Sequence, residues 1–120
     1  MDTRQVAEEF TRLCKAGQFD EAGQKFWSDK VVSIEAMDGP MARCSGLKEV
    51  LAKGQWWYEN HEIHSFATEG PFLNGDQFAL RFEIDVTPKT GEGAGQRIKM
   101  AEVGLYTVKD GKVVEERFFY

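Results

Sequence analysis

Glu35 is the residue of this sequence best suited by type and position to chemistry. It closes the apolar segment Lys30–Glu35, in which strand alternation puts it on one face with Val31 and Ser33. Apolar walls disfavour the charged form of a carboxyl group, so its pKa rises toward the range useful for moving protons. The alternative is a solvent-exposed carboxylate at the end of a strand, beside Asp38.

Glu116 is the second candidate, because alternation in the last segment puts it on one face with Phe118 and Tyr120. Two carboxylates in one apolar site can divide the acid and base roles, since their mutual repulsion separates their pKa values. The alternative is that Glu116 forms an ion pair with an Arg or Lys across the sheet.

The two histidines, His61 and His64, do not have the spacing of joint metal ligands. On a strand, residues three apart point to opposite faces, so we expect no metal site. His64 shares a face with Phe66 and Thr68, which makes it a third catalytic candidate as a hydrogen-bond partner in a cavity. The alternative is a structural or solvated histidine.

Neither a cofactor nor a nucleophilic cysteine is expected. The glycine-rich segment 88–96 lacks the phosphate-binding motifs and is better explained as a mobile loop. Cys14 falls on an apolar helical stripe, which favours a small buried residue, and Cys44 falls in a loop.

Composition narrows the class of protein further. The 120 residues include 15 Lys and Arg against 20 Asp and Glu, a net charge of −5 that argues against a nucleic-acid partner. No apolar run approaches the ~20 residues that span a bilayer, and the polar start lacks the features of a signal peptide. We therefore expect a cytoplasmic protein with no membrane partner. Nine Phe, three Trp and three Tyr suggest rings that line a cavity or an interface.

Two kinds of element must position the candidate residues. Apolar residues at helical spacing predict three helices, and Gly17 provides the stop after the first. A period of two then predicts a series of strands, with Asn74-Gly75 as a hairpin turn. Gly104 suggests a bulge or sharp bend in the fourth of them. The predicted helices are Thr3–Ala16, Asp20–Trp27 and Leu47–Asn60, and the predicted strands are Lys30–Glu35, His61–Gly70, Gln77–Thr87, Lys99–Val108 and Lys112–Tyr120.

The order of these elements resembles the nuclear transport factor 2-like superfamily, and within it the SnoaL-like polyketide cyclase and ketosteroid isomerase branch. The similarity spans nearly the whole chain, so we expect a single SnoaL-like domain over residues 1–120. The residues that carry it are Gly17-Gln18-Phe19-Asp20, Phe26-Trp27-Ser28-Asp29-Lys30-Val31, Gly46-Leu47-Lys48-Glu49, Asn74-Gly75-Asp76 and Asp110-Gly111-Lys112-Val113-Val114-Glu115.

The resemblance implies an α+β fold in which three N-terminal helices pack on the concave face of a cone-shaped, strongly curved, mostly antiparallel sheet (a cystatin-like α+β roll). It implies an apolar cavity inside the cone and a homodimer formed through the outer face of the sheet. Alternation directs Glu102 away from this cavity, so it could instead lie at the dimer interface. The expected pocket residues are Phe10, Cys14, Ser33, Trp57, Tyr58, Phe82, Ile84, Val103, Phe118 and Tyr120.

The implied function is binding of a small apolar, polyketide-like or steroid-like molecule, with isomerase, cyclase or dehydratase chemistry. Glu35 would be the base and Glu116 the acid. The ketosteroid isomerase pattern has a tyrosine on helix one and a carboxylate on a late strand, and the matching positions here hold Phe10 and Val103. The chain therefore departs from ketosteroid isomerase proper. The alternative function is a non-catalytic ligand-binding or assembly module of the same fold.

Overall fold

Three helices form where the apolar periodicity predicts them, each within one residue of the expected bounds. The computed structural model describes residues 1–120. The Asp2 carboxylate accepts a hydrogen bond from the Gln5 amide while the Gln5 side chain accepts one from the Asp2 amide, a reciprocal cap that starts the first helix. Gly17 follows its end with a φ of +77°, a conformation that favours glycine. The helices are α1 (Thr3–Lys15), α2 (Phe19–Phe26) and α3 (Leu47–Glu59).

Five strands form where the period-two alternation predicts them, and a sixth is absent from the sequence-based expectation. Three residues in extended conformation, Arg43–Ser45, pair with the first strand, and so short a segment has no readable period. The third strand continues past the predicted Gly70 because Pro71 lies at an irregularity of an edge strand, where no ladder donor is needed. The strands are β1 (Trp27–Ile34), β2 (Arg43–Ser45), β3 (His61–Asn74), β4 (Gln77–Pro88), β5 (Ile98–Lys109) and β6 (Lys112–Phe119).

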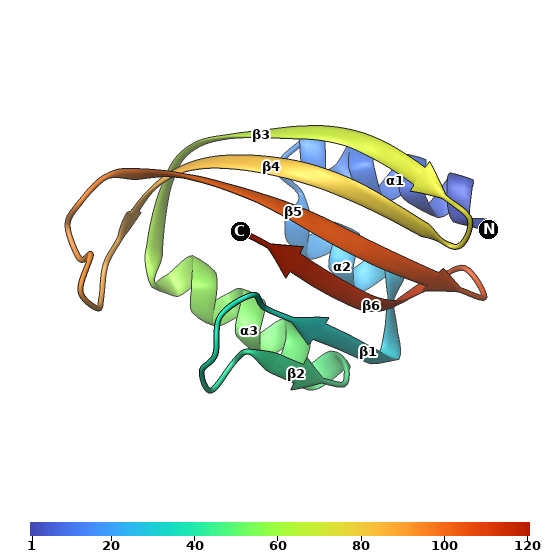
Figure 1. The fold of residues 1–120 in the computed structure, drawn as a ribbon, viewed down its shortest axis with the longest axis horizontal. Coiled ribbons are helices and arrows are strands. Elements are labelled where there is room, and N and C mark those ends of the chain that lie inside the picture. The colour runs from blue at the N-terminus through green and yellow to red at the C-terminus, as the bar shows by residue number, and fades with distance from the viewer.

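One curved sheet contains all six strands in the order β2-β1-β6-β5-β4-β3. Only β1 and β6 run parallel, so the sheet is mostly antiparallel, as predicted. Figure 1 shows α1 and α2 against the face of the long strands, with α3 beside β1 and β2. The predicted α+β architecture, three helices packed on a mostly antiparallel sheet, is therefore confirmed. No helix is long and apolar enough to cross a membrane.

The core fills the space between α1, α2 and the concave face of the sheet. On β4 the expected face is confirmed, since Phe78, Leu80, Phe82 and Val86 are buried while Arg81 and Glu83 form ion pairs on the other side. Aromatic rings from α1, β4 and β5 meet at its centre, where the ring of Tyr106 stacks on Phe78 at 4.9 Å and lies 4.8 Å from Phe10. The buried side chains at this place form one packed cluster.

No bulge lies at Gly104, where the sequence suggests a bulge or a sharp bend. The ladder is regular there, with Gly104 opposite Leu80 and Phe118, and the nearest irregularity lies between Thr107 and Val108. Glycine is needed for a different reason: a Cβ at this position would lie 2.8 Å from the hydroxyl of Tyr106. The tyrosine side chain lies directly over the backbone of its own strand.

Candidate functional site

Glu116 lies buried at the junction of β1 and β6, with both carboxylate oxygens hydrogen-bonded. The Trp27 indole nitrogen donates to one oxygen at 2.9 Å and the Ser33 hydroxyl donates to the other at 2.7 Å. Parallel pairing of β1 with β6 puts Ser33 directly beside Glu116. Burial raises the pKa of Glu116, an effect opposed by the hydrogen bond from Ser33 and by the charge of Lys53.

Lys53 joins Glu116 indirectly to Glu35. Its ammonium group donates to the Ser33 hydroxyl at 2.7 Å and lies 2.6 Å from one oxygen of Glu35. The second Glu35 oxygen accepts a hydrogen bond from the Tyr120 hydroxyl at 3.1 Å. Glu35 therefore faces the inside of the fold but has a cation and a hydroxyl as partners.

Glu102 is the third carboxylate of this group, and the structure corrects our expectation for it. Its strand buries Gly104 and Tyr106, so Glu102 shares the inward face, opposite the buried Phe82 on β4. No hydrogen bond or ion pair holds its carboxylate. Burial raises the pKa of Glu102 to about 7, and the neighbouring charge of Glu35 adds to this shift.

The Tyr106 hydroxyl, like the carboxylate of Glu102, has no hydrogen-bond partner. The side chain is 3% exposed and its oxygen lies over Gly104, two residues along the strand from Glu102. Burial raises the pKa of Tyr106 well above its ordinary value, and the charges of Glu116 and Glu102 act in the same direction. The hydroxyl therefore stays protonated and can donate a hydrogen bond.

The structure places most of the other expected pocket residues on the inward face. Phe10, Cys14 and Phe82 are buried in the core, Ile84 packs against it, and Phe118 lies 5.2 Å below the Lys53 ammonium. Burial raises the pKa of Cys14 to about 12, so its thiol is not a nucleophile at neutral pH.

Three of the expected site residues lie away from the carboxylates. Val103 lies three residues before Tyr106 on β5, so it points to the opposite, outer face of the sheet. His64 is exposed and hydrogen-bonds the Thr87 hydroxyl at 2.7 Å, at an irregularity of β3. Trp57 stacks on His61 at 4.3 Å near the end of α3.

Tyr58 follows Trp57 near the end of α3, and its hydroxyl is partly buried. Burial raises the pKa of Tyr58 to about 12, and the charge of Asp20 adds to this shift. The two consecutive rings thus have different surroundings, as their angular separation on a helix requires.

Lys53, Trp27 and Tyr106 were not identified from the sequence as site residues, and Glu102 was directed away from the site. A signal existed for two of them: Lys53 is three residues after the buried Val50 on α3, and a lysine on that side of an amphipathic helix needs a partner. For Glu102, the signal is that most of the large apolar residues of β5 lie an even number of positions away and so share its face of the strand. A face rich in apolar residues is the inward one.

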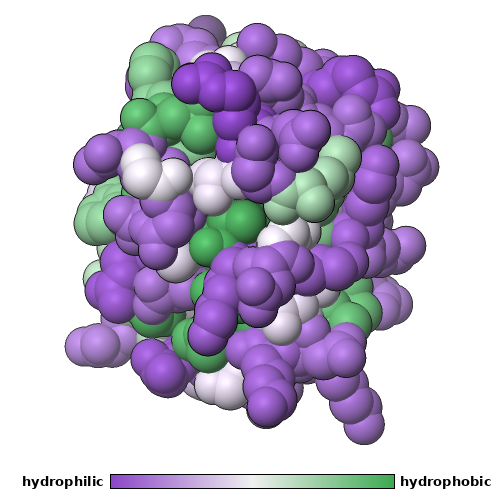
Figure 2. Space-filling view, turned by 90° about the vertical axis from the view of Figure 1, so that its right-hand side faces the viewer, coloured by the Kyte–Doolittle hydropathy of each residue, from purple (hydrophilic) through white to green (hydrophobic).

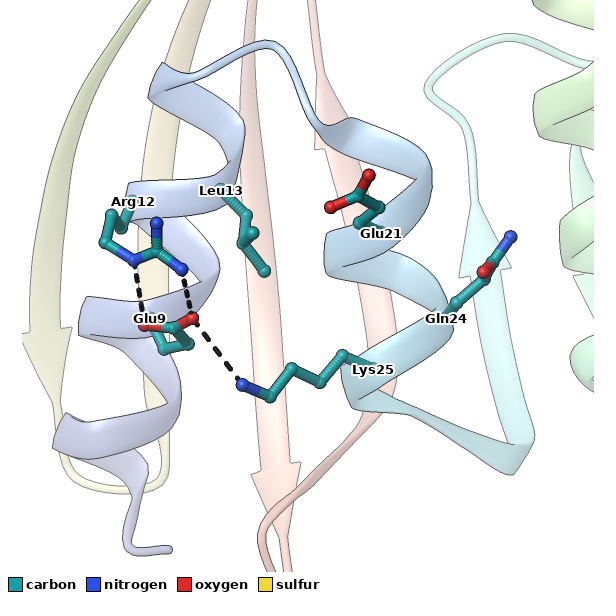
Figure 3. Close-up of a pocket in the computed structure, with 6 residues that line it drawn as sticks. All are labelled: Glu9, Arg12, Leu13, Glu21, Gln24 and Lys25. Atoms are coloured by element: carbon teal, nitrogen blue, oxygen red, sulfur yellow. Dashed lines mark hydrogen bonds and ion pairs between the residues drawn. The ribbon is translucent and has the colours of Figure 1, made fainter.

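Two surface depressions lie elsewhere. One, of about 450 Å³, lies between α1 and α2 and is lined mainly by paired charges, with Glu9 bonded to Arg12 and Lys25 within 3.5 Å (Figure 3). Another, of about 430 Å³, is lined by residues of β3, β4 and β5, among them Phe66, Ile84 and Met100. Figure 2 shows one end of the molecule covered mostly by hydrophilic residues, with small scattered apolar areas. No group of three or more His, Cys, Asp or Glu side chains is arranged to hold a metal ion.

Comparison with known proteins identifies the group of proteins that share this architecture. The family model described as the SnoaL-like domain matches residues 1–120. A crystal structure from Mesorhizobium loti is 52% identical over 100% of both chains, with a TM-score of 0.96; its provisional name is SnoaL-like polyketide cyclase, with carbohydrate phosphatase as a second label.

More distant structures share the fold alone. A protein of unknown function with a cystatin-like fold from Xanthomonas campestris is 21% identical over 99% of this chain and 90% of its own, with a TM-score of 0.76. A protein with a ketosteroid isomerase-like fold from Catenulispora acidiphila, in complex with trimethylamine, is 12% identical over 82% of this chain and 72% of its own, with a TM-score of 0.67. No curated protein matches the chain.

Proposed function

Because the chain belongs to the SnoaL-like domain family, we propose that it is an acid–base enzyme that moves a proton on a small, largely apolar molecule. The observation that carries the proposal is Glu102, a partly buried carboxylate without a partner, whose pKa of about 7 lets it both accept and donate a proton at neutral pH. Isomerisation, cyclisation and dehydration all require such a group.

The assignment of roles differs from the one made from the sequence. Glu35 has Lys53 and Tyr120 on its two oxygens, and Glu116 has Trp27 and Ser33 on its own. Since a proton-transfer group must reach its substrate, we assign the transfer to Glu102. Glu35 and Glu116 then act as fixed hydrogen-bond acceptors around it.

A simple reaction shows what these groups can do. Ionised Glu102 takes a proton from the carbon between a carbonyl and a carbon–carbon double bond, and the electron pair moves onto the carbonyl oxygen. The Tyr106 hydroxyl donates a hydrogen bond to this oxygen and stabilises its developing charge. Glu102 then returns the same proton to the far carbon of the double bond, which restores the enzyme and leaves a conjugated ketone.

Turnover of a panel of β,γ-unsaturated ketones, followed by the absorbance of the conjugated product, tests the proposal. We expect Glu102→Gln to lower kcat/KM by about 10²-fold or more, the typical contribution of a general base. Glu92→Gln changes an exposed glutamate of the loop between β4 and β5 and serves as the matched control. Full activity in Glu102→Gln, or a loss confined to Glu35→Gln, would contradict the assignment.

A non-catalytic binding or assembly module is the second candidate. The ion pair of Glu35 with Lys53 and the filled aromatic core favour it, because such contacts serve stability without any chemistry. The fluorescence of 2-naphthol, an aromatic alcohol that resembles an enolate, separates the two. Because Glu102 is neutral while it holds the proton of the enolate, tighter binding to Glu102→Gln than to wild type above pH 7 supports the enzyme. Equal binding with no turnover of any ketone supports the module.

A further inference from the structure

Lys53 is the one cation among the three inward carboxylates. It comes from α3, and only 14% of its side chain is exposed. Its ammonium group contacts Glu35 at 2.6 Å, the Ser33 hydroxyl at 2.7 Å and the face of the Phe118 ring at 5.2 Å. Two of the three N–H donors of the ammonium group are therefore directed to Glu35 and Ser33. The Phe118 ring faces the same positive charge.

The contact with Ser33 determines the direction of a hydrogen bond to Glu116. A hydroxyl group has one proton to donate, and Ser33, which is fully buried, accepts from Lys53. Its proton is then directed to Glu116 at 2.7 Å, and Trp27 occupies the other oxygen of the same carboxylate. Lys53 thus organises Glu35 directly and Glu116 through one hydroxyl.

From this geometry we propose that Lys53 is a positioning residue that divides the three carboxylates: it holds Glu35 and Glu116 in fixed pairs and leaves Glu102 free to exchange a proton with a ligand. The proposal rests on the proposed role of Glu102. Neither carboxylate that Lys53 organises has an oxygen left without a partner, whereas Glu102 has none engaged.

The charge on Lys53 also acts on Glu102 across the site. It lowers the pKa of Glu102, in opposition to burial and to the repulsion by Glu35, which has the larger effect of the two charges. Other titratable groups face the same region from every neighbouring element. They are Cys14 on α1, Cys44 on β2, Tyr106 on β5, and Glu116 and Tyr120 on and after β6.

Carboxyl-carbon NMR titration of the glutamates tests the proposal without a substrate. Lys53→Met removes the attraction between Lys53 and the ionised Glu102 but leaves the repulsion by Glu35. The titration midpoint of the Glu102 carboxyl should therefore rise by about one pH unit. The double change Lys53→Met with Glu35→Gln removes both charges, and the midpoint should fall to the wild-type value or below it. Lys53→Arg keeps the charge and should leave the midpoint near 7.

A matched control and a folding check accompany these variants. Lys48→Met removes an exposed lysine of the same helix and should not move the Glu102 midpoint. The double variant also covers the case in which Lys53→Met alone does not fold, because it leaves no unpaired glutamate at position 35. An unchanged Glu102 midpoint in Lys53→Met would overturn the proposal and, where only the double variant folds, so would a midpoint above the wild-type value. Unchanged activity in Glu102→Gln would instead overturn only the proposed function.

Discussion

At the residue scale, the carboxylate of Glu102 opposes the stability of the fold. A partly buried acid without a partner favours its neutral form, and here its pKa is about 7 against an ordinary value of 4.5. Functional groups are commonly kept in such unfavourable surroundings because a stabilised group would have lost its reactivity.

This effect predicts how stability changes with pH. Between about pH 4.5 and 7 the native state keeps a proton that the unfolded state releases, so the free energy of unfolding falls as the pH rises. Glu102→Gln stays neutral and should be more stable than wild type by about 2 kcal/mol at pH 8, after allowance for partial exposure, with little difference at pH 4.5. Urea unfolding at the two pH values measures it.

The matched control for this measurement is Glu92→Gln, which removes the same charge from an exposed loop. It should show no such pH dependence. An equal stability of Glu102→Gln and wild type at pH 8 would mean that solvent reaches the Glu102 carboxylate freely.

At the element scale, two elements place the site: α3 carries Lys53 over the sheet, and β5 carries Glu102 and Tyr106 on its inward face. Each of these two elements contains a glycine, and the surroundings of the two glycines differ. Gly54 on α3 has nothing within 4 Å of the position of a Cβ, whereas Gly104 on β5 has the Tyr106 side chain at 2.8 to 3.0 Å.

The two glycines predict opposite results for the same substitution. Gly54→Ala should raise the free energy of unfolding by about 0.5–1 kcal/mol, since alanine favours the helix and meets no neighbour. Gly104→Ala should lower it by about 1–3 kcal/mol, because the Tyr106 ring is held against Phe78 and Phe10 and has no room to move. Urea unfolding of the pair measures both. A neutral Gly104→Ala would show that the tyrosine side chain shifts easily.

At the scale of the whole molecule, the outer face of the sheet exposes apolar side chains beside charged ones. Phe119 is 49% exposed and lies opposite Val103 in the ladder, and Leu105 follows on the same side. We propose that this face forms a homodimer, as the resemblance to the family implies, because exposed apolar residues clustered on one face are typical of protein contacts.

Light scattering at micromolar concentration tests the homodimer. Wild type should have twice the mass of the chain, and Phe119→Glu, which adds a charge to the centre of this face, should have the mass of one chain. Met37→Glu places the same charge on an exposed residue of the loop after β1 and should stay dimeric. A wild-type mass of one chain would contradict the homodimer.

Local sequence alone determined the helices, the long strands and the inward faces of β1 and β4. These features depend on short-range preferences: the Asp2 cap, the stop at Gly17 and the alternation around Phe82 are all set by neighbours along the chain. Alternation put Glu35 on one face with Ser33 and put Glu116 on one face with Phe118, and the resemblance to the family directed these faces inward. For Glu102 the assignment was wrong, although the apolar residues of its own strand indicated the inward face.

The partners of these side chains were decided only by the tertiary structure. Ser33 and Glu116 are 83 residues apart and meet because β1 pairs in parallel with β6, a choice that no local pattern encodes. Lys53 reaches Glu35 because α3 packs beside β1. Whether a carboxylate is paired or free depends on such long-range contacts, which the sequence does not reveal. The sequence therefore indicated Glu35 as the base, whereas in the structure Glu35 is paired and Glu102 is the carboxylate without a partner.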